Sequence, residues 1–310
     1  MRVVVTGGAG FIGSHLVEDL LRRGASVAVV DDFSSGKDAN LAGIKGPLDV
    51  FRTSITDLDS LKRPMADANL VLHLAARTSV PRSVANPIES NHANIDGTLN
   101  VLVAARDAGI RRVVFAASSS AYGETPTLPK SEAMPPEPIS PYGITKLVGE
   151  LYAQVFGRCY GLENVSLRYF NVFGPRQDPS SPYSGVLSRF ITAMRDGEQP
   201  VVFGDGEQTR DFTYVSNVVD ATLRAAETPG VSGLVFNVGT GGRFSLNYAL
   251  ALLAKISGKP GNAKYDLPRS GDIRDSQADI SLAREKLGYV PTVDFEEGLR
   301  RTWEWYQVQQ

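Results

Sequence analysis

The chain has 310 residues, of which 21% are charged, and its formal net charge is −2 at pH 7. A balance so close to neutral argues against a nucleic-acid-binding surface or an anionic-membrane surface. Cys159 is the single cysteine, which excludes an internal disulfide and a cysteine-based metal cage, and we predict no metal site. The sequence enters an apolar segment at once and holds no apolar run of ~20 residues, so we expect a cytoplasmic protein without signal peptide or membrane span.

Short apolar or β-branched runs alternate with amphipathic stretches through the first half of the chain. The runs cover residues 3–5, 27–30, 70–74, 113–117 and 165–169, and helical patterns cover 12–23 and 93–107. Runs that are apolar throughout are typical of strands buried on both faces of a parallel sheet. The alternation therefore predicts an α/β fold with a Rossmann-type, doubly wound parallel sheet.

The pattern changes after residue 174, where prolines, glycines and polar residues gather in 177–184 and predict a loop. We assign residues 1–174 to a dinucleotide-binding domain. We expect 211–238 to rejoin its sheet, because 234–238 is again an apolar run. Residues 175–210 and 239–310 then form a smaller, C-terminal substrate-binding domain.

Three glycines, Gly7, Gly10 and Gly13, are spaced as GxxGxxG between the first strand and the first helix. A glycine motif is weak evidence alone, but this one has the strand before it and the helix after it that dinucleotide binding requires. The amides of the helix N-terminus can meet a pyrophosphate. Asp31, at the end of the second strand, can accept hydrogen bonds from the adenosine ribose and repel a 2′-phosphate, which favours NAD over NADP. Two alternatives stay open: Asp32 can make the same contact, and the glycines can serve only a tight turn.

A second motif, Tyr142 with Lys146, begins a predicted helix that has Ser140 as N-cap and Pro141 as first residue. Helix residues four apart face the same side. A phenol with a pKa of about 10 is a poor base at neutral pH, but a neighbouring ammonium and the positive charge of oxidised nicotinamide favour the phenolate. The spacing alone is common on helix surfaces. It gains force from the serines 118–120, which follow a strand and can hydrogen-bond a sugar hydroxyl or a developing ketone.

With these motifs in place, the sequence resembles the extended short-chain dehydrogenases/reductases, and among them the UDP-hexose 4-epimerases. The resemblance covers nearly the whole chain and is specific for enzymes that modify nucleotide sugars. It is carried by residues 6–13, 31, 33–36, 73–76, 94–98, 118–123, 142–146, 168–176, 204–206, 210–211 and 269–272. It implies NAD as cofactor, a UDP-sugar as substrate, and a homodimer with helices 93–107 and 146–158 as candidate interface.

The resemblance implies a 4-epimerisation. Tyr142 takes the proton of the sugar 4-hydroxyl while C4 passes its hydride to tightly held NAD. The 4-keto sugar turns about its diphosphate link, and the same hydride returns to the opposite face. Lys146 also holds the nicotinamide ribose, and no external oxidant is consumed.

The resemblance further implies the residues of the site, each carried over from a matching motif. The catalytic residues are Tyr142, Lys146, Ser118 and Ser119, with Ser118 the best candidate for the sugar 4-oxygen. The cofactor-binding residues are Gly7, Gly10, Phe11, Ile12, Gly13, Asp31, Asp32, Ser35, Gly36, Leu74, Ala75, Ala76, Asn94, Tyr142, Lys146 and Tyr169. The substrate-binding residues are Thr78, Ser79, Ser118, Ser120, Asn171, Val186, Leu187, Phe203, Arg210, Arg269, Asp272 and Ser276.

Two positions indicate which reaction and which sugar to expect. Dehydratases similar to this chain carry Thr-Asp-Glu where the serines 118–120 stand, and UDP-glucuronate decarboxylases usually keep a glutamate at Ser120. Elimination lacks its acid and base without those carboxylates, whereas epimerisation needs none. Ser276 stands where epimerases restricted to glucose and galactose have a tyrosine, so it leaves room for a 2-acetamido group. We expect interconversion of UDP-GlcNAc and UDP-GalNAc, and of UDP-Glc and UDP-Gal as well.

Other features leave alternatives. Ser54 occupies a place where the family often has an aspartate on adenine, and Thr78 replaces a lysine of some epimerases. Another nucleotide-sugar enzyme of the family, such as a 2-epimerase, reductase or dehydratase, stays open. So does a non-catalytic dinucleotide sensor. The presence of both Tyr142 and Lys146 argues against the sensor.

Overall fold

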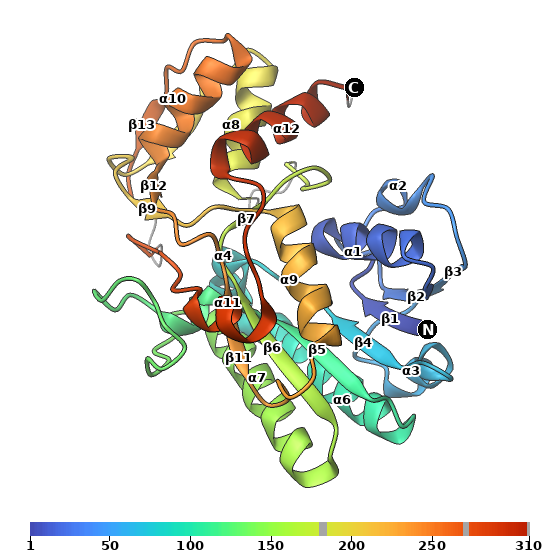
Figure 1. The fold of residues 1–310 in the computed structure, drawn as a ribbon. Helices are drawn as coiled ribbons and strands as arrows, with labels where there is room; N and C mark the ends of the chain where they lie inside the picture. Colours follow the sequence, from blue (N-terminus) through green and yellow to red (C-terminus); the bar gives the residue numbers. More distant parts are fainter. Residues whose placement is uncertain (180–184, 269–272, 309–310) are drawn as a thin grey trace.

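A computed structural model of the chain describes residues 1–179, 185–268 and 273–308. Its centre is a seven-stranded sheet in the order β11-β6-β5-β4-β1-β2-β3, and all neighbouring strands run parallel (Figure 1). The strands are β1 (Arg2–Thr6), β2 (Ser26–Asp31), β3 (Leu48–Arg52), β4 (Leu70–His73), β5 (Arg112–Ser118), β6 (Glu163–Tyr169) and β11 (Val235–Val238). Because the chain runs outward from β1 in both directions, the sheet is doubly wound, which confirms the predicted fold class.

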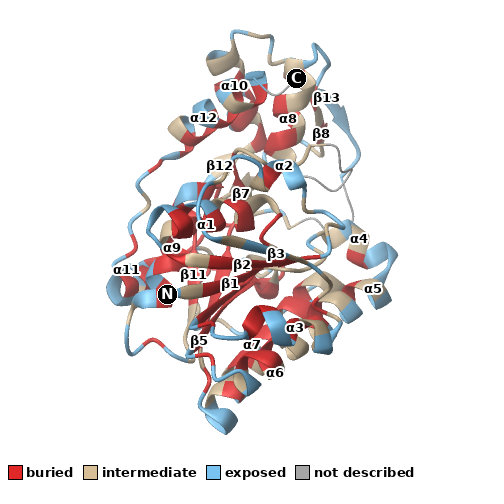
Figure 2. Cartoon of the chain, turned by 90° about the vertical axis from the view of Figure 1, so that its right-hand side faces the viewer, coloured by how far each residue is buried: buried red, intermediate tan, exposed pale blue. Residues whose placement is uncertain are grey.

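Helices cover both faces of the sheet, and the apolar strands are buried between them (Figure 2). One face packs against α1 (Phe11–Arg22), α9 (Val215–Glu227) and α11 (Ser281–Leu287). The other packs against α3 (Leu58–Met65), α6 (Gly97–Asp107) and α7 (Pro141–Tyr160). Short helical pieces occupy the connections: α2 (Asp38–Leu41), α4 (Val80–Ala85), α5 (Pro87–Asn91), a π-helical turn (His92–Asp96) and a 3₁₀ turn (Ser119–Tyr122).

A separate hydrophobic cluster lies beyond the sheet, in the upper part of Figure 1. Its helices are α8 (Val186–Arg195), α10 (Leu246–Ser257) and α12 (Phe295–Val308). Three two-stranded ladders accompany them: β7 (Val172–Phe173) with β10 (Thr213–Tyr214), β8 (Val201–Phe203) with β13 (Lys264–Asp266), and β9 (Thr209–Arg210) with β12 (Phe244–Ser245). In the described part of the chain, no helix is long and apolar enough to cross a membrane.

The placement of α9, β11 and α11 bears on how the chain divides. α9 and β11 belong to the sheet layer, where the sequence assigned 211–238. α11 does as well: Ala283, Leu287 and Tyr289 join the core beneath the sheet, not the second cluster. Residues that follow 239 therefore contribute to both hydrophobic clusters.

Arg112 ties α9 to the sheet from a fully interior position. Its side chain is 1% exposed, and its Nη1 donates to the carbonyl oxygens of Ala225, Ala226 and Thr228 at 2.9, 3.1 and 2.7 Å. Its Nε also reaches Glu163 at 2.9 Å. A cation at a helix C-terminus satisfies carbonyls that have no intrahelical partner and complements the helix dipole.

We expect Arg112→Met to lower the free energy of unfolding by roughly 2–4 kcal/mol, because it leaves buried carbonyl oxygens without donors. Chemical denaturation measures the change. Arg111→Met is the matched control, since that side chain is 54% exposed and its loss should cost less than ~0.5 kcal/mol. Equal effects of the two substitutions would contradict this role of Arg112.

Candidate active site

A cavity of about 620 Å³ opens where the parallel strands end. Its walls come from the segments that directly follow β1, β2, β3, β4, β5 and β6, together with residues 210, 273 and 276. In a doubly wound sheet this edge, beside the point where the strand order reverses, is where ligands bind. The two motifs singled out from the sequence, more than a hundred residues apart, both line it.

The glycine loop is shaped by contacts that leave no room for side chains. Gly7 has φ +71°, and its amide donates to the Val30 carbonyl at 2.8 Å. A Cβ on Gly13 would lie 2.1 Å from the Gly7 carbonyl oxygen, so only glycine lets the first turn of α1 press against the loop. Gly10 is the N-cap of that helix and has no side-chain cap. The helix N-terminus therefore faces the cavity with unsatisfied amides, a cradle that fits the pyrophosphate of a dinucleotide.

Asp31 ends β2 at the cavity wall and is 6% exposed. One carboxylate oxygen accepts from the Ala9 amide at 2.9 Å and the other from the Phe33 amide at 2.8 Å. Burial raises the pKa of Asp31, and these two hydrogen bonds act against the increase. Gly36 packs behind it, because a Cβ there would meet both carboxylate oxygens within 3 Å. The carboxylate is thus held in place with lone pairs left for ribose hydroxyls.

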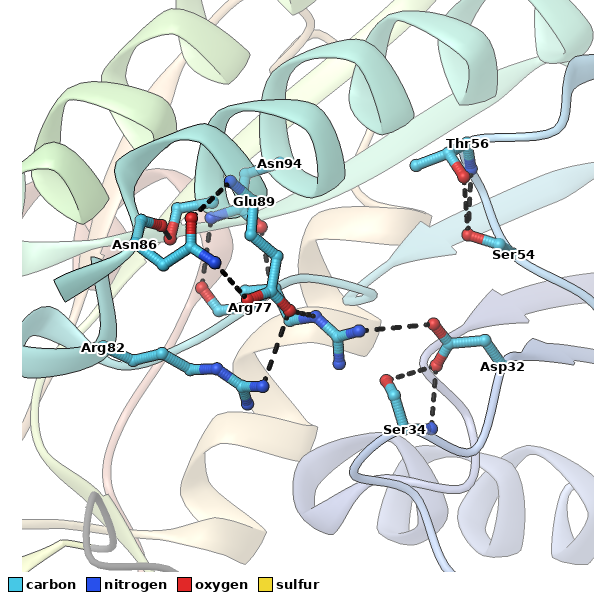
Figure 3. Close-up of polar contacts among 10 residues, drawn as sticks. Asp32, Ser34, Ser54, Thr56, Arg77, Arg82, Asn86, Glu89 and Asn94 are labelled. Carbon is cyan, nitrogen blue, oxygen red and sulfur yellow. Dashed lines mark hydrogen bonds and ion pairs between the residues drawn. The ribbon is translucent and has the colours of Figure 1, made fainter. Parts of the chain in front are cut away.

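Beside Asp31, ion pairs link the segments that follow β2 and β4 to helix α5 (Figure 3). Arg77, which follows β4, lies 3.9 Å from Asp32 and 3.1 Å from Glu89 of α5. Asn94 fixes the Arg77 backbone: its Oδ1 accepts from the Arg77 amide at 2.7 Å and its Nδ2 donates to the Arg77 carbonyl at 3.1 Å. Asn94 itself is buried and does not line the cavity. The structure therefore places this predicted cofactor ligand one layer behind the wall.

Tyr142 and Lys146 enter the cavity from the first turns of α7. Ser140 caps that helix as predicted, with its Oγ accepting from the Gly143 amide at 3.1 Å. The Tyr142 amide donates to Ser83 Oγ at 3.0 Å, which anchors the helix start to α4. Lys146 Nζ donates to the Ala116 carbonyl at 2.8 Å.

The serine turn completes this end of the cavity. Ser118 Oγ accepts from the Ser120 amide at 3.2 Å and from Ser120 Oγ at 2.8 Å. Ser118 also acts on the Tyr142 side chain, whose pKa it lowers. Ser119 lines the cavity next to them. A base, an ammonium and hydroxyl donors thus converge on one space, the arrangement that proton transfer to or from a sugar hydroxyl requires.

Burial changes the acidity of both ionisable groups. It raises the pKa of Tyr142 to about 12, and the hydrogen bond with Ser118 acts against that increase. Burial lowers the pKa of Lys146 to about 8, while the nearby Glu150 acts to raise it. Without a further positive charge in the cavity, Tyr142 is therefore a phenol at neutral pH.

The sugar-side residues fall into three groups. Thr78, Ser79, Ser120, Asn171, Arg210 and Ser276 line the cavity. Val186, Leu187 and Phe203 do not, and Leu187 is 2% exposed inside the second hydrophobic cluster. Arg269 and Asp272 lie outside the described residues. Of the cofactor set, Gly36 and Asn94 are the two that do not line the cavity.

Asn171 and Ser276 form one wall together. Asn171 Nδ2 donates to Ser276 Oγ at 3.0 Å and to the Asp211 carbonyl at 3.2 Å. Asn171 adopts φ +31°, and asparagine tolerates that region better than most residues. Ser276 is 8% exposed, so a larger side chain there would intrude on the cavity or on Asn171.

Several charged residues of the cavity wall were not among the predicted site residues. They are Lys37, Arg77, Arg82, Arg176 and Asp178. Lys37 Nζ lies 3.0 Å from the Asp178 carboxylate, which joins the loop after β2 to the loop after β7. Position at the carboxyl ends of strands is the one signal that could have found them, because surface charge alone does not distinguish them. In the described part of the chain, no group of three or more His, Cys, Asp or Glu side chains could hold a metal ion.

Comparisons with known proteins agree with this geometry. Residues 3–239 match the NAD dependent epimerase/dehydratase family. The chain is 41% identical over 312 residues to a UDP-glucose 4-epimerase of Mycolicibacterium smegmatis, covering 99% of both chains. Its fold matches a UDP-N-acetylglucosamine 4-epimerase of Methanobrevibacter ruminantium in complex with UDP-N-acetylmuramic acid (TM-score 0.95, 42% identity, 100% and 99% coverage). It also matches a Thermus thermophilus UDP-glucose 4-epimerase in complex with NAD (TM-score 0.93, 37% identity, 100% coverage of both).

The family match spans more than two thirds of the chain and includes both motifs of the cavity. It confirms the expected kinship with the extended short-chain dehydrogenases/reductases and the expected cofactor. The chain belongs to the NAD dependent epimerase/dehydratase family, among the UDP-hexose 4-epimerases.

Proposed function

We propose that this chain is a cytoplasmic UDP-sugar 4-epimerase that interconverts UDP-GlcNAc with UDP-GalNAc, and UDP-Glc with UDP-Gal, through a 4-keto intermediate. The observation that carries the proposal is the convergence of Tyr142, Lys146 and Ser118 on the cavity that the glycine loop also lines. The named activities of the relatives, which this chain matches over nearly its whole length, support the same reaction.

The residues that line the cavity suit the chemical groups of NAD. The amides at the start of α1 would hold the pyrophosphate, Asp31 the adenosine ribose, and Lys146 the nicotinamide ribose. Bound in its oxidised form, NAD supplies a reversible hydride acceptor and a positive charge. That charge is what Tyr142 needs to ionise, since its desolvation alone favours the phenol.

Each residue at this end of the cavity has a separate role in the proposed reaction. Tyr142 accepts the proton of the sugar 4-hydroxyl and returns it later. Lys146, when charged, stabilises the phenolate, and Ser118 donates to the 4-oxygen as it becomes a ketone. The serine turn holds no carboxylate, so nothing there would abstract the C5 proton or protonate a leaving 6-hydroxyl. The proposed chemistry therefore stops at hydride transfer and proton return, which is epimerisation.

We expect Tyr142→Phe to reduce kcat by roughly 10²–10⁴-fold, the contribution of one positioned acid–base group. Turnover is measured by nuclear magnetic resonance on UDP-GlcNAc. Tyr289→Phe serves as control, because its buried hydroxyl donates to the Gly239 carbonyl at 2.8 Å and the residue does not line the cavity. Near-normal turnover by Tyr142→Phe would rule out the proposed base.

We expect Gly13→Ala to abolish retention of NAD, because the added Cβ would lie 2.1 Å from the Gly7 carbonyl oxygen. Bound NAD is quantified after denaturing the purified protein. Gly109→Ala is the matched control, since its Cβ would meet nothing within 4 Å and its effect should be limited to ~1 kcal/mol of backbone strain at φ +68°. A Gly13→Ala protein that keeps a full complement of NAD would contradict the assigned pyrophosphate site.

In this proposal, the acetamido group of the sugar lies against the wall that Asn171 and Ser276 form. We expect Ser276→Tyr to lower kcat/KM for UDP-GlcNAc by at least ~10-fold, while the value for UDP-Glc changes by less than ~3-fold. The ratio of the two specificity constants is the readout, and Ser276→Ala, which adds no bulk, controls for the lost hydroxyl. An unchanged ratio in Ser276→Tyr would place the acetamido group elsewhere.

A homodimer through α7 forms part of the proposal. Ile144, Leu151 and Val155 are 49%, 52% and 47% exposed and recur at helical spacing along α7. A row of exposed apolar side chains of this kind typically marks an interaction surface. α6 packs beside α7 on the same face of the sheet.

We therefore expect Leu151→Glu to convert a dimer to a monomer in light scattering, because a charge would be buried at the centre of the contact. Val290→Glu is the control, as Val290 is 53% exposed but follows α11 on the opposite face of the sheet. A wild-type protein that is monomeric at micromolar concentration would contradict this interface.

A further inference from the structure

A buried ion pair stands directly behind the proposed catalytic pair. Glu150 lies on α7, one turn beyond Lys146 and two turns beyond Tyr142, and it is 2% exposed. Arg168 of β6 contacts both of its carboxylate oxygens, with Nε–Oε1 at 2.9 Å and Nη2–Oε2 at 2.8 Å. The contact is bidentate and removed from water, the geometry in which a guanidinium binds a carboxylate most strongly.

Lys146 and Glu150 have the spacing at which a helix normally forms its own ion pair. They do not form one here: within the described residues, no contact of 4 Å or less joins Lys146 Nζ to a carboxylate. Lys146 instead donates to the Ala116 carbonyl on β5 and lines the cavity. Glu150 is available to Lys146 along the helix, but Arg168 occupies it.

Arg168 is fixed in this role by its surroundings. It lies between Ala117 of β5 and Asn237 of β11 in the sheet register. Its guanidinium carbon sits 4.5 Å from the centre of the Tyr122 ring, and the Tyr122 hydroxyl donates to Asn237 at 2.7 Å. The remaining Arg168 nitrogen, Nη1, is buried without a hydrogen-bond partner. Glu150 is thus the one carboxylate it contacts among the described residues.

We propose that Arg168 is a positioning residue that acts through Lys146: by holding both oxygens of Glu150, it prevents the lysine from pairing along the helix and leaves it directed at the cavity. The inference rests on the proposed role of Lys146 in catalysis. Glu150 then affects Lys146 without binding it. The carboxylate remains close enough to favour the charged form of Lys146, yet the ammonium group stays available to the phenolate and the ribose.

Removing Arg168 alone should release Glu150 to compete for Lys146, whereas removing both partners should abolish the competition. We expect Arg168→Met to lower kcat by roughly 10- to 100-fold, less than the loss of the acid–base group itself. The double variant Arg168→Met/Glu150→Met should recover at least ~10-fold of that loss, since apolar replacement of a buried ion pair is often tolerated. A double variant no more active than Arg168→Met would overturn the proposal.

The pH profile of kcat separates this role from a merely structural one. The groups that face Lys146 are Tyr142 and Glu150 on α7, and His73 on β4, whose pKa burial lowers to about 3. In Arg168→Met, the unpaired Glu150 anion should move the loss of activity at high pH to a higher pH than in the wild type. In the double variant, loss of the anion should move it to a lower pH. An unchanged alkaline limb in both variants would overturn the proposal.

Folding and cofactor content are measured for each variant by thermal unfolding and by released NAD. If Arg168→Met does not fold, Arg168→Lys takes its place, because an ammonium keeps the charge but cannot contact both oxygens. It should show a smaller loss that Glu150→Met again relieves, and no relief would contradict the idea. Tyr142→Phe is measured in parallel. Normal turnover by Tyr142→Phe would defeat the proposed function. If Tyr142→Phe is inactive but Arg168→Met/Glu150→Met is no more active than Arg168→Met, only the role of Arg168 is defeated.

Discussion

Burial of two ionisable side chains at the end of a parallel sheet is the constraint on which the rest of this structure depends. Removal from water makes Tyr142 a weaker acid, so its neutral form is favoured in the protein alone, whereas Lys146, whose pKa falls to about 8, stays largely charged at neutral pH. A neutral phenol cannot remove a proton from a sugar hydroxyl. The site therefore depends on a second cation beside Lys146, and in the proposed reaction the oxidised cofactor held by the glycine loop supplies it. Reactivity is coupled in this way to occupancy of the dinucleotide site.

The fold serves that coupling through its strand ends. The glycine loop follows β1, the serine turn follows β5, and α7 returns from the serine turn to place Tyr142 opposite the loop. Around them, hydrogen bonds fix the orientation of charged side chains. Two backbone amides donate to the Asp31 carboxylate, and Arg168 donates to both carboxylate oxygens of Glu150. A side chain whose other possible partners are already paired needs little reorganisation when substrate binds. Such preorganisation is the condition for electrostatic stabilisation of a developing charge.

Much of the fold and of the catalytic end was predictable from sequence, because local rules and global packing agree there. Each of these features depends on a steric or hydrogen-bonding requirement that a single short segment of sequence meets. This holds for the apolar strands, the tight glycine turn and the Ser140 cap. The strand β3, at the sheet edge, shows no apolar run, because it carries charged and exposed residues. Asn94 and Leu187 were predicted to bind cofactor and substrate, respectively, but neither lines the cavity. Sequence motifs identify residues that matter to a site without showing whether they touch the ligand or hold what does. Likewise Arg77 became a wall residue only through its place after β4.

In the proposed reaction, the same hydride leaves C4 and returns to it within one site. This is tested with UDP-GlcNAc that carries deuterium at C4, incubated with purified protein and no added cofactor. We expect UDP-GalNAc in which the C4 deuterium is retained, with product far exceeding the NAD bound to the protein. Loss of the label to solvent, or release of reduced cofactor in proportion to product, would contradict it.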